Sequence, residues 1–291
     1  GLTGGGPAQQ PSNTAFTLDP MDSTARPVTV GVTTEFQPRS EHRALALPSG
    51  DVLIAGGKGA GGAVLGSTVR YFANTRLLSG QGTMVTPRAG HTLTTIARGG
   101  YELAVAIGGL DKDGKPIKTI EAFSVNPEQT GCPGMETPSA DRGCWINSAQ
   151  LSVPRWGHSA LALVDGNEIL IAGGFTTADQ ATPTTNMELL RQDFVGANDV
   201  LGTTYTVGDL SKARGAMGSA ITTDGVNQVV VFSGGVQTAT SQATVERVER
   251  RPTPGTKVPE FVTVPLDMSC QRAGLPEARW SAQSVPLANG T

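Results

Sequence analysis

The chain has 291 residues and a formal net charge of −3, without any run of basic residues, and this argues against a nucleic-acid partner. No apolar stretch approaches the roughly 18 residues that a membrane-spanning helix needs. The 38 glycines, the 19 prolines and an aromatic content of only 5% are typical of turn-rich β structure. Because the sequence opens without an initiator methionine or a signal peptide, we expect a mature or trimmed product.

One phrase recurs along the chain: an Arg, a His or Met three residues later, an apolar run, and then Gly-Gly. Four copies are continuous, and they begin at Arg39, Arg88, Arg155 and Arg214. A fifth copy is split between the chain ends, because an opening at Arg279 runs out at Thr291 and residues 1–6 supply a Gly-rich ending. A repeat at a period of tens of residues indicates a repeat architecture.

Each copy has the pattern of a β-hairpin. In the third copy, two apolar runs at 159–164 and 169–172 flank the turn residues Asp165 and Gly166. A third strand is expected after each Gly-Gly, at 13–17, 68–72, 119–123, 186–190 and 244–248. A less regular fourth strand is expected around Trp145 and at 204–207. Four strands in each repeated unit predict a β-propeller.

The phrase resembles the Kelch repeat in its Arg-x-x-His opening, its diglycine and its third-strand glutamate at Glu121, Glu188 and Glu246. It departs from the family where Ala15 and Arg70 replace that glutamate, and where only Trp145 supplies a clear fourth-strand tryptophan. The resemblance implies an all-β fold, a Kelch-like β-propeller with 4–8 blades.

The second glycines of the copies stand at positions 5, 57, 109, 174 and 235, at intervals of 52 to 65 residues. A Kelch unit has about 50 residues, so no interval hides a second blade. We expect one five-bladed domain over 1–291, closed by pairing the N- and C-terminal segments in one blade; a larger ring with missing pieces is the alternative. The expected blades are approximately 1–36 with 277–291, 37–85, 86–152, 153–210 and 211–276.

Cys132 and Cys144 bracket an irregular loop that contains two prolines. A disulfide between them would contribute about 3 kcal/mol by restricting the unfolded chain, and would indicate an oxidising compartment; two free thiols are the alternative. Cys270 has no evident mate. Together with the Thr-, Ala- and Gly-rich composition, the predicted disulfide suits an exported bacterial protein that is secreted, periplasmic or at the cell surface.

The three histidines, His42, His91 and His158, occupy the same position of the repeat, and this favours a shared structural role over a metal site. Residues 110–121 faintly resemble a calcium loop, but the first Asp is missing and three lysines oppose a cation. We therefore expect neither a metal nor another cofactor.

The repeat arginines are the candidate ligand-binding residues, because a ring would place them at one level near one face. By the Kelch resemblance, Arg39, Arg88, Arg155, Arg214 and Arg279 could bind acidic ligands, with Trp156 and Trp280 adding aromatic surface. The alternative is that each arginine pairs locally with backbone carbonyls or with the third-strand glutamate.

We expect a non-enzymatic binding or scaffold module that recognises a protein or an acidic glycan or peptide through the loops of a propeller face. No Gly-x-Ser-x-Gly, P-loop or His-Glu-x-x-His motif occurs, so no catalytic residue is assigned. The alternative is a Kelch enzyme of the sugar-acid mutarotase or epimerase type, with Glu41 and Arg43 as the only clustered candidates. A carboxyl with a raised pKa facing unpaired arginines would favour the enzyme, whereas locally paired arginines would favour the module.

Overall fold

The computed structural model is an all-β fold, and its described part contains no α-helix. The residues that the structure describes are 2–3, 10–11, 14–17, 28–32, 36–98, 101–124, 143–163, 166–191, 202–223, 228–238, 240–256, 258–264 and 274–279. A single 3-10 turn, Ala60–Gly62, interrupts the strands. No helix in this described part is long and apolar enough to cross a membrane.

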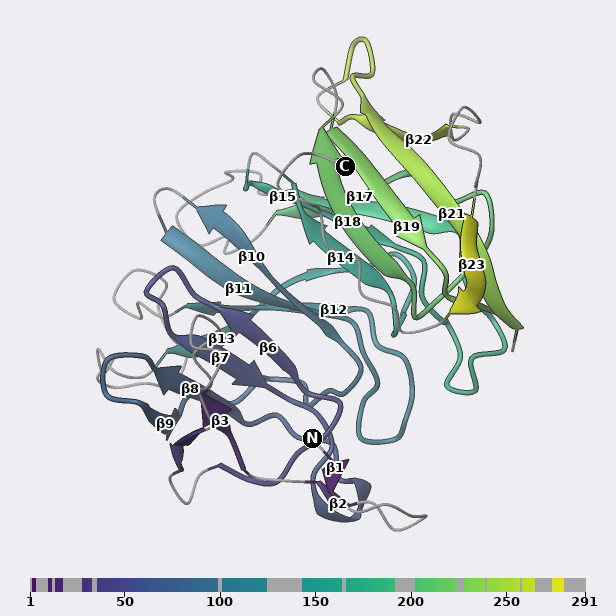
Figure 1. Cartoon of the computed structure of the whole chain (residues 1–291). Coiled ribbons are helices and arrows are strands. Elements are labelled where there is room, and N and C mark those ends of the chain that lie inside the picture. Colours follow the sequence, from purple (N-terminus) through teal and green to yellow (C-terminus); the bar gives the residue numbers. More distant parts are fainter. Residues whose placement is uncertain are drawn as a thin grey trace.

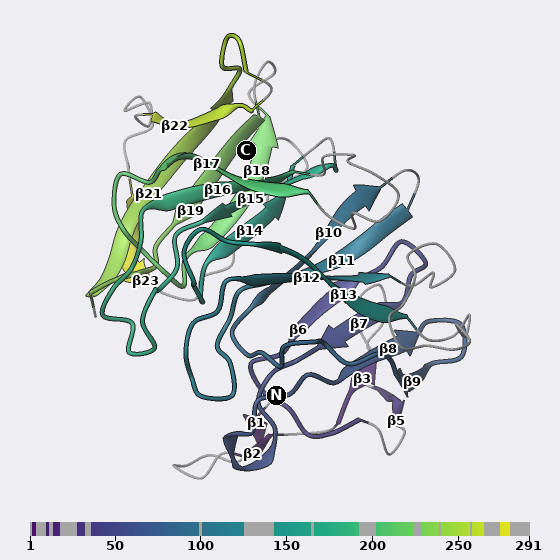
Figure 2. The same ribbon diagram turned by 180° about the vertical axis from the view of Figure 1, so that it is seen from behind.

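Four antiparallel sheets, numbered here sheets 1 to 4, follow one another in chain order (Figures 1 and 2). Sheet 1 contains β6 (Arg43–Ala46), β7 (Val52–Ala55), β8 (Thr68–Phe72) and β9 (Leu77–Gly80). Sheet 2 contains β10 (Thr92–Arg98), β11 (Tyr101–Ile107), β12 (Thr119–Ser124) and β13 (Cys144–Gln150). Sheet 3 contains β14 (Ser159–Ala162), β15 (Glu168–Ala172), β16 (Asn186–Arg191) and β17 (Thr203–Asp209). Sheet 4 is built on β18 (Gly218–Thr223), β19 (Gln228–Ser233), β21 (Thr240–Arg251) and β22 (Glu260–Val264).

The sheets are arranged like propeller blades, because equivalent strands of successive sheets are neighbours. The first strands β6, β10, β14 and β18 contact one another in that order, and the last strands β13, β17 and β22 do the same. We call the first strand of each sheet its inner strand. The expected hairpins and third strands of the four continuous copies are confirmed, and β8 spans the expected 68–72. Strands β13 and β17 match the fourth strands expected around Trp145 and at 204–207.

The remaining strands are short or extend these sheets. In the N-terminal segment, β1 (Leu2–Thr3) pairs with β2 (Gln10–Pro11), and β3 (Phe16–Thr17) pairs with β4 (Val28–Thr29). Strand β5 (Gly31–Val32) adds to sheet 1 in parallel with β9, and the two-residue β20 (Val236–Gln237) pairs with β21.

One strand differs from the expected blade boundaries. Strand β23 (Gly274–Arg279), part of which was expected to open the split blade, pairs instead with the first part of β21 in sheet 4. Strand β21 has 12 residues, and β22 pairs only with its second part, so the first part leaves backbone groups that β23 can bind. The chain end from residue 280 onward, which should close the ring, lies outside the described residues.

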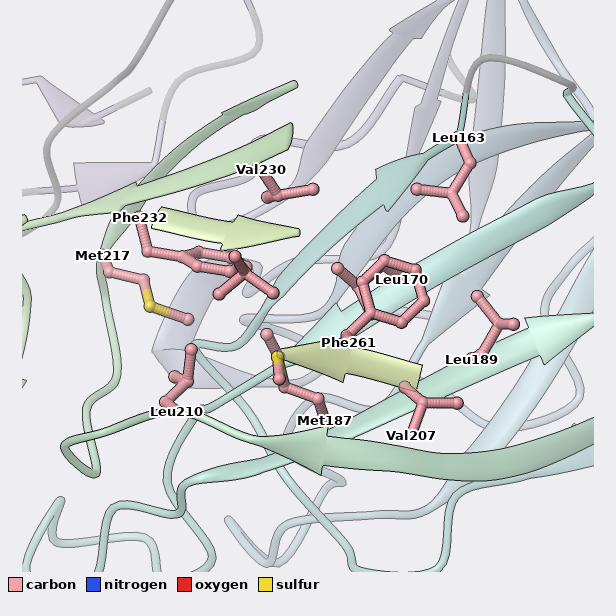
Figure 3. Close-up of a cluster of buried hydrophobic side chains, with 12 residues drawn as sticks. Leu163, Leu170, Met187, Leu189, Val207, Leu210, Met217, Val230, Phe232 and Phe261 are labelled. Atoms are coloured by element: carbon pink, nitrogen blue, oxygen red, sulfur yellow. The ribbon is translucent and has the colours of Figure 1, made fainter. Parts of the chain in front are cut away.

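The hydrophobic core lies between neighbouring sheets. The cluster between sheets 3 and 4 is drawn in Figure 3, where Leu170 and Leu189 of sheet 3 lie near Phe232 and Phe261 of sheet 4. A second cluster joins sheets 2 and 3, and a third joins sheets 1 and 2 around Phe123 and Trp145, whose rings are 5.2 Å apart. Strand β15 is buried along its whole length, as expected for a strand covered on both faces, whereas three of the four residues of β6 are exposed.

The structure describes only one of the two cysteines of the predicted disulfide. Cys144 begins β13 and is buried, whereas Cys132 lies outside the described residues. The bridge between them stays a prediction.

Candidate functional site

The repeat arginines are buried inside their own sheets. Arg39, Arg88, Arg155 and Arg214 are each 0% exposed. In sheet 2, Nη1 of Arg88 donates to the carbonyls of Gly108 (3.0 Å) and Thr119 (2.9 Å), and Nη2 donates to the hydroxyl of Thr119 (3.0 Å) and to Glu121. The guanidinium thus joins the diglycine to the start of the third strand.

The same contacts recur in the other sheets. Arg155 bonds the carbonyls of Gly173 and Asn186, each at 3.0 Å, and pairs with Glu188 at 2.6 Å. Arg214 repeats this arrangement with Gly234, Thr244 and Glu246, and Arg39 bonds Gly56 and Ser67. The second carboxylate oxygen of each glutamate accepts from a backbone N–H three residues before the arginine, that of Val85, Ser152 or Ser211.

Sheet 1 shows what happens where the third-strand glutamate is replaced. Arg70 stands at that position and pairs with Asp51 within the same sheet. The guanidinium of Arg39 lies 5.6 Å from the centre of the Phe36 ring, and this cation–π contact takes the place of the carboxylate. Arg39 therefore stays buried in its sheet, although Arg70 stands in place of the third-strand glutamate.

These four arginines do not form an exposed platform for an acidic ligand. Desolvation lowers the pKa of Arg88, Arg155 and Arg214, their glutamates oppose that effect, and desolvation lowers the pKa of Arg39 to about 10. All four stay charged at neutral pH, and their charge is used within the sheet. The alternative interpretation, local pairing, is what the structure shows. Trp280 lies outside the described residues, as does the side chain of Arg279.

The diglycine connects each sheet to the next through backbone atoms. The N–H groups of Gly57, Gly109 and Gly174 donate to the carbonyls of the next repeat arginines, Arg88, Arg155 and Arg214, each at 2.9 Å. Gly109 has φ +105°, and an added Cβ would lie 2.8 Å from the Ala89 carbonyl oxygen and 2.9 Å from Cβ of His91. Only glycine satisfies this backbone angle and this spacing.

A second set of backbone bonds links the sheets two residues after each repeat arginine. Gly90 N–H donates to the carbonyl of Glu41 (3.4 Å), Gly157 to Gly90 (3.3 Å) and Ala216 to Gly157 (2.7 Å). All four residues have positive φ, between 51° and 61°. They form an arc, called here the hub arc, that passes from sheet 1 to sheet 4. The equivalent position of the split copy is residue 281.

His91 lies at the joint between sheets 1 and 2, and His158 at the joint between sheets 2 and 3. Cε1 of His91 and of His158 stands next to Gly56 and Gly108, the first diglycine glycine of the preceding sheet. Burial, with positive charge from nearby arginines, holds the pKa of both His91 and His158 well below its usual value. Among the described residues, no three His, Cys, Asp or Glu side chains lie close enough together to hold a metal ion.

The two candidate residues of the enzymatic alternative, Glu41 and Arg43, each bind a different partner. Glu41 pairs with Lys58 at 2.9 Å, and Arg43 donates from Nε to the carbonyl of His91 at 2.8 Å. Where the pKa of a described carboxyl is shifted, it is lowered. In Asp51, desolvation would raise the pKa, but hydrogen bonds from Ala73 and Arg70 lower it. A hydrogen bond from Lys112 lowers the pKa of Asp113, and one from Thr177 lowers the pKa of Asp179.

Loops of different sequence gather on one side of the sheets. In sheets 1 to 3, the residue after the diglycine pairs both with the residue after the repeat arginine and with the far end of its own loop. The central residues of these pairings are Lys58, Leu110 and Phe175. We call the loops 58–65, 110–117 and 175–184 the loop face; Figure 1 shows them projecting from the same side of the molecule.

Trp156 lies at the base of the loop face. Its ring is 5.3 Å from that of Phe175, and its Nε1 donates to the carbonyl of Thr177 at 2.9 Å. The ring is half-buried and packs beside Gly90 of the hub arc. Trp156 therefore supports the longest of the three loops, and it leaves part of its surface on this side.

Comparison of the sequence with protein-family models gives no match, and comparison with curated proteins gives none either.

Proposed function

We propose that this chain is a Kelch-like five-bladed propeller that acts as a rigid, non-enzymatic binding module, with the loop face as its contact surface for a protein or glycan partner. The observation that carries the proposal is the uniform anchoring of three loops that differ in sequence. A scaffold that repeats while its loops vary is typical of binding folds. The predicted disulfide supports a location outside the reducing cytosol.

The chemistry of the loop face suits a polar partner of mixed charge. Loop 110–117 carries exposed Lys112 and Asp113, which pair with each other at 2.9 Å. Loop 175–184 is rich in threonine and rests on Trp156. Since the repeat arginines are buried, a strong preference for acidic ligands is no longer favoured at this face. Hydroxyls, mixed charges and an aromatic edge fit a protein or glycan surface.

The enzyme of the sugar-acid type has less support. Its mechanism requires a carboxyl poised as acid or base beside free arginines. Glu41 is held by Lys58, and the four described repeat arginines are bound inside their sheets.

The loop face can be tested with a photo-crosslinking amino acid placed at one exposed position at a time. Lys112 and Ala178 lie on the loop face, whereas Asn74 lies in the turn between β8 and β9, at the opposite end of the strands. In cells that produce the protein naturally, positions 112 and 178 are expected to capture the same partner, and position 74 is expected to capture none. Equal capture from position 74, or different species from 112 and 178, would contradict the assignment.

Ring closure is the second part of the proposal. The hub arc runs through four sheets, and residue 281 of the split copy would supply the next backbone group. Deleting 280–291 is expected to lower the melting temperature and cause aggregation, because sheet edges become exposed. A circular permutant that joins residue 291 to residue 1 and opens the turn at Asn74 should keep the wild-type melting temperature. A deletion variant with unchanged melting temperature and a monomeric elution profile would rule out this closure.

A further inference from the structure

Four residues after the repeat arginine, Thr92 in sheet 2 and Ser159 in sheet 3 carry hydroxyls that join neighbouring inner strands. Thr92 Oγ1 bonds Nε2 of His158 at 2.9 Å, which links sheets 2 and 3. The hydroxyl of Ser159 bonds that of Ser219, which links sheets 3 and 4. Between sheets 1 and 2, Arg43 occupies the same position. A long cation thus stands where sheets 2 and 3 have a small hydroxyl and sheet 4 has Gly218.

This departure leaves a hydrogen bond unmade. His91 is 0% exposed, and neither of its ring nitrogens has a hydrogen-bond partner, whereas Nε2 of the equivalent His158 is bonded to Thr92. Arg43 reaches past the ring and bonds the backbone carbonyl of His91. A buried polar atom without a partner is destabilising. Arg43 leaves the His91 ring without the hydrogen bond that Thr92 makes to His158, and this suggests that Arg43 has a role other than stability.

The guanidinium of Arg43 differs from those of the repeat arginines. Arg43 is exposed, and within the described part of the chain its bond to His91 is its only hydrogen bond and no carboxylate pairs with it. Its pKa is nevertheless lowered by desolvation, and its charge lowers the pKa of His42, His91 and His158 after the larger effects of burial. The charge of Arg43 is therefore felt at the start of three inner strands, β6, β10 and β14.

We propose that Arg43 anchors a binding site for a small anion, a carboxylate or a phosphate-like oxyanion, at the start of β6 beside β10. The bond from Nε fixes the guanidinium, and its two terminal nitrogens remain as a planar pair of donors. Such a fork matches the two oxygens of a carboxylate or phosphate. This site is separate from the loop face, and the proposal does not depend on the proposed binding function.

The site can be tested on the whole chain with acetate and with inorganic phosphate as probes at low ionic strength. The chain has only three histidines, all near Arg43, so their Hε1 resonances report binding directly. Saturable shifts of the His42 and His91 signals are expected in the wild type. In Arg43→Gln the affinity is expected to fall at least about tenfold, the loss of a charge-assisted pair of bonds.

Two further variants control for charge and for folding. Arg76→Gln removes an exposed arginine from the turn after β8 and should leave the affinity unchanged. Arg43→Thr restores the hydroxyl of the repeat, so it should abolish binding while the melting temperature holds or rises. Acetate binding alone would assign a carboxylate site, and phosphate binding alone an oxyanion site. The proposal is overturned if neither probe saturates, if Arg43→Gln binds like wild type, or if Arg76→Gln weakens binding equally.

Discussion

Replacing Arg155 by alanine is expected to reduce the free energy of unfolding by about 3–5 kcal/mol, the usual effect of breaking a buried ion pair. The substitution leaves Glu188 buried without its cation, and the carbonyls of Gly173 and Asn186 lose their donor. Because the side chain is 0% exposed, we expect no separate effect on ligand affinity. Urea unfolding followed by tryptophan fluorescence measures the change.

Two variants make this expectation specific. Arg76→Ala removes an exposed arginine and should change stability by no more than about 0.5 kcal/mol. The double variant Arg155→Met with Glu188→Leu should lose less than the sum of the two single variants, since no uncompensated charge remains. A nearly unchanged unfolding midpoint in Arg155→Ala would contradict the structural role of the buried arginine.

Replacing Gly109 by alanine should be similarly severe, with a loss of at least about 3 kcal/mol, because a strained backbone and overpacking act together. Its φ is +105°, and the new Cβ would stand 2.8 Å from the Ala89 carbonyl oxygen. That contact lies at the joint where Gly109 N–H donates to the Arg155 carbonyl. The segment that leads into β10 of the same sheet would have to shift, next to the bond that joins sheets 2 and 3.

Gly114 provides the matched control within the same loop. It also has positive φ, +72°, but a Cβ there would meet nothing within 4 Å. Gly114→Ala should therefore cost only about 1–2 kcal/mol, the backbone strain alone. The difference in unfolding free energy between the two variants measures the close approach at the diglycine. Equal losses would mean that backbone strain, and not the close approach to Ala89 and His91, explains the second glycine.

The sequence allowed the strands to be predicted because each copy repeats the same local pattern. The apolar runs around Asp165 and Gly166 and the third strand at 68–72 were recovered, since local hairpin patterns and core packing agree. The chain ends were harder, because pairing across the split copy has no local signal. Strand β23 binds the free part of β21.

The site was less predictable, because an arginine motif can serve a surface or a core equally well. The third-strand glutamates were the signal for burial, since a carboxylate at a fixed distance along each repeat indicates a fixed partner. Arg43 was noticed only for its neighbours Glu41 and His42. Comparison of the four copies at that position, where Thr92, Ser159 and Gly218 stand, would have singled it out.

The hub arc and the diglycine joints have a consequence for how such a chain can change. Both connect sheets through main-chain N–H and carbonyl groups, which every residue type except proline carries. A whole unit can therefore be copied, exchanged or allowed to drift in sequence without loss of its attachment to its neighbours. Selection need preserve only a few residues in each unit, the arginine and the glycines foremost. The loops are left free to diverge while the frame that holds them stays constant.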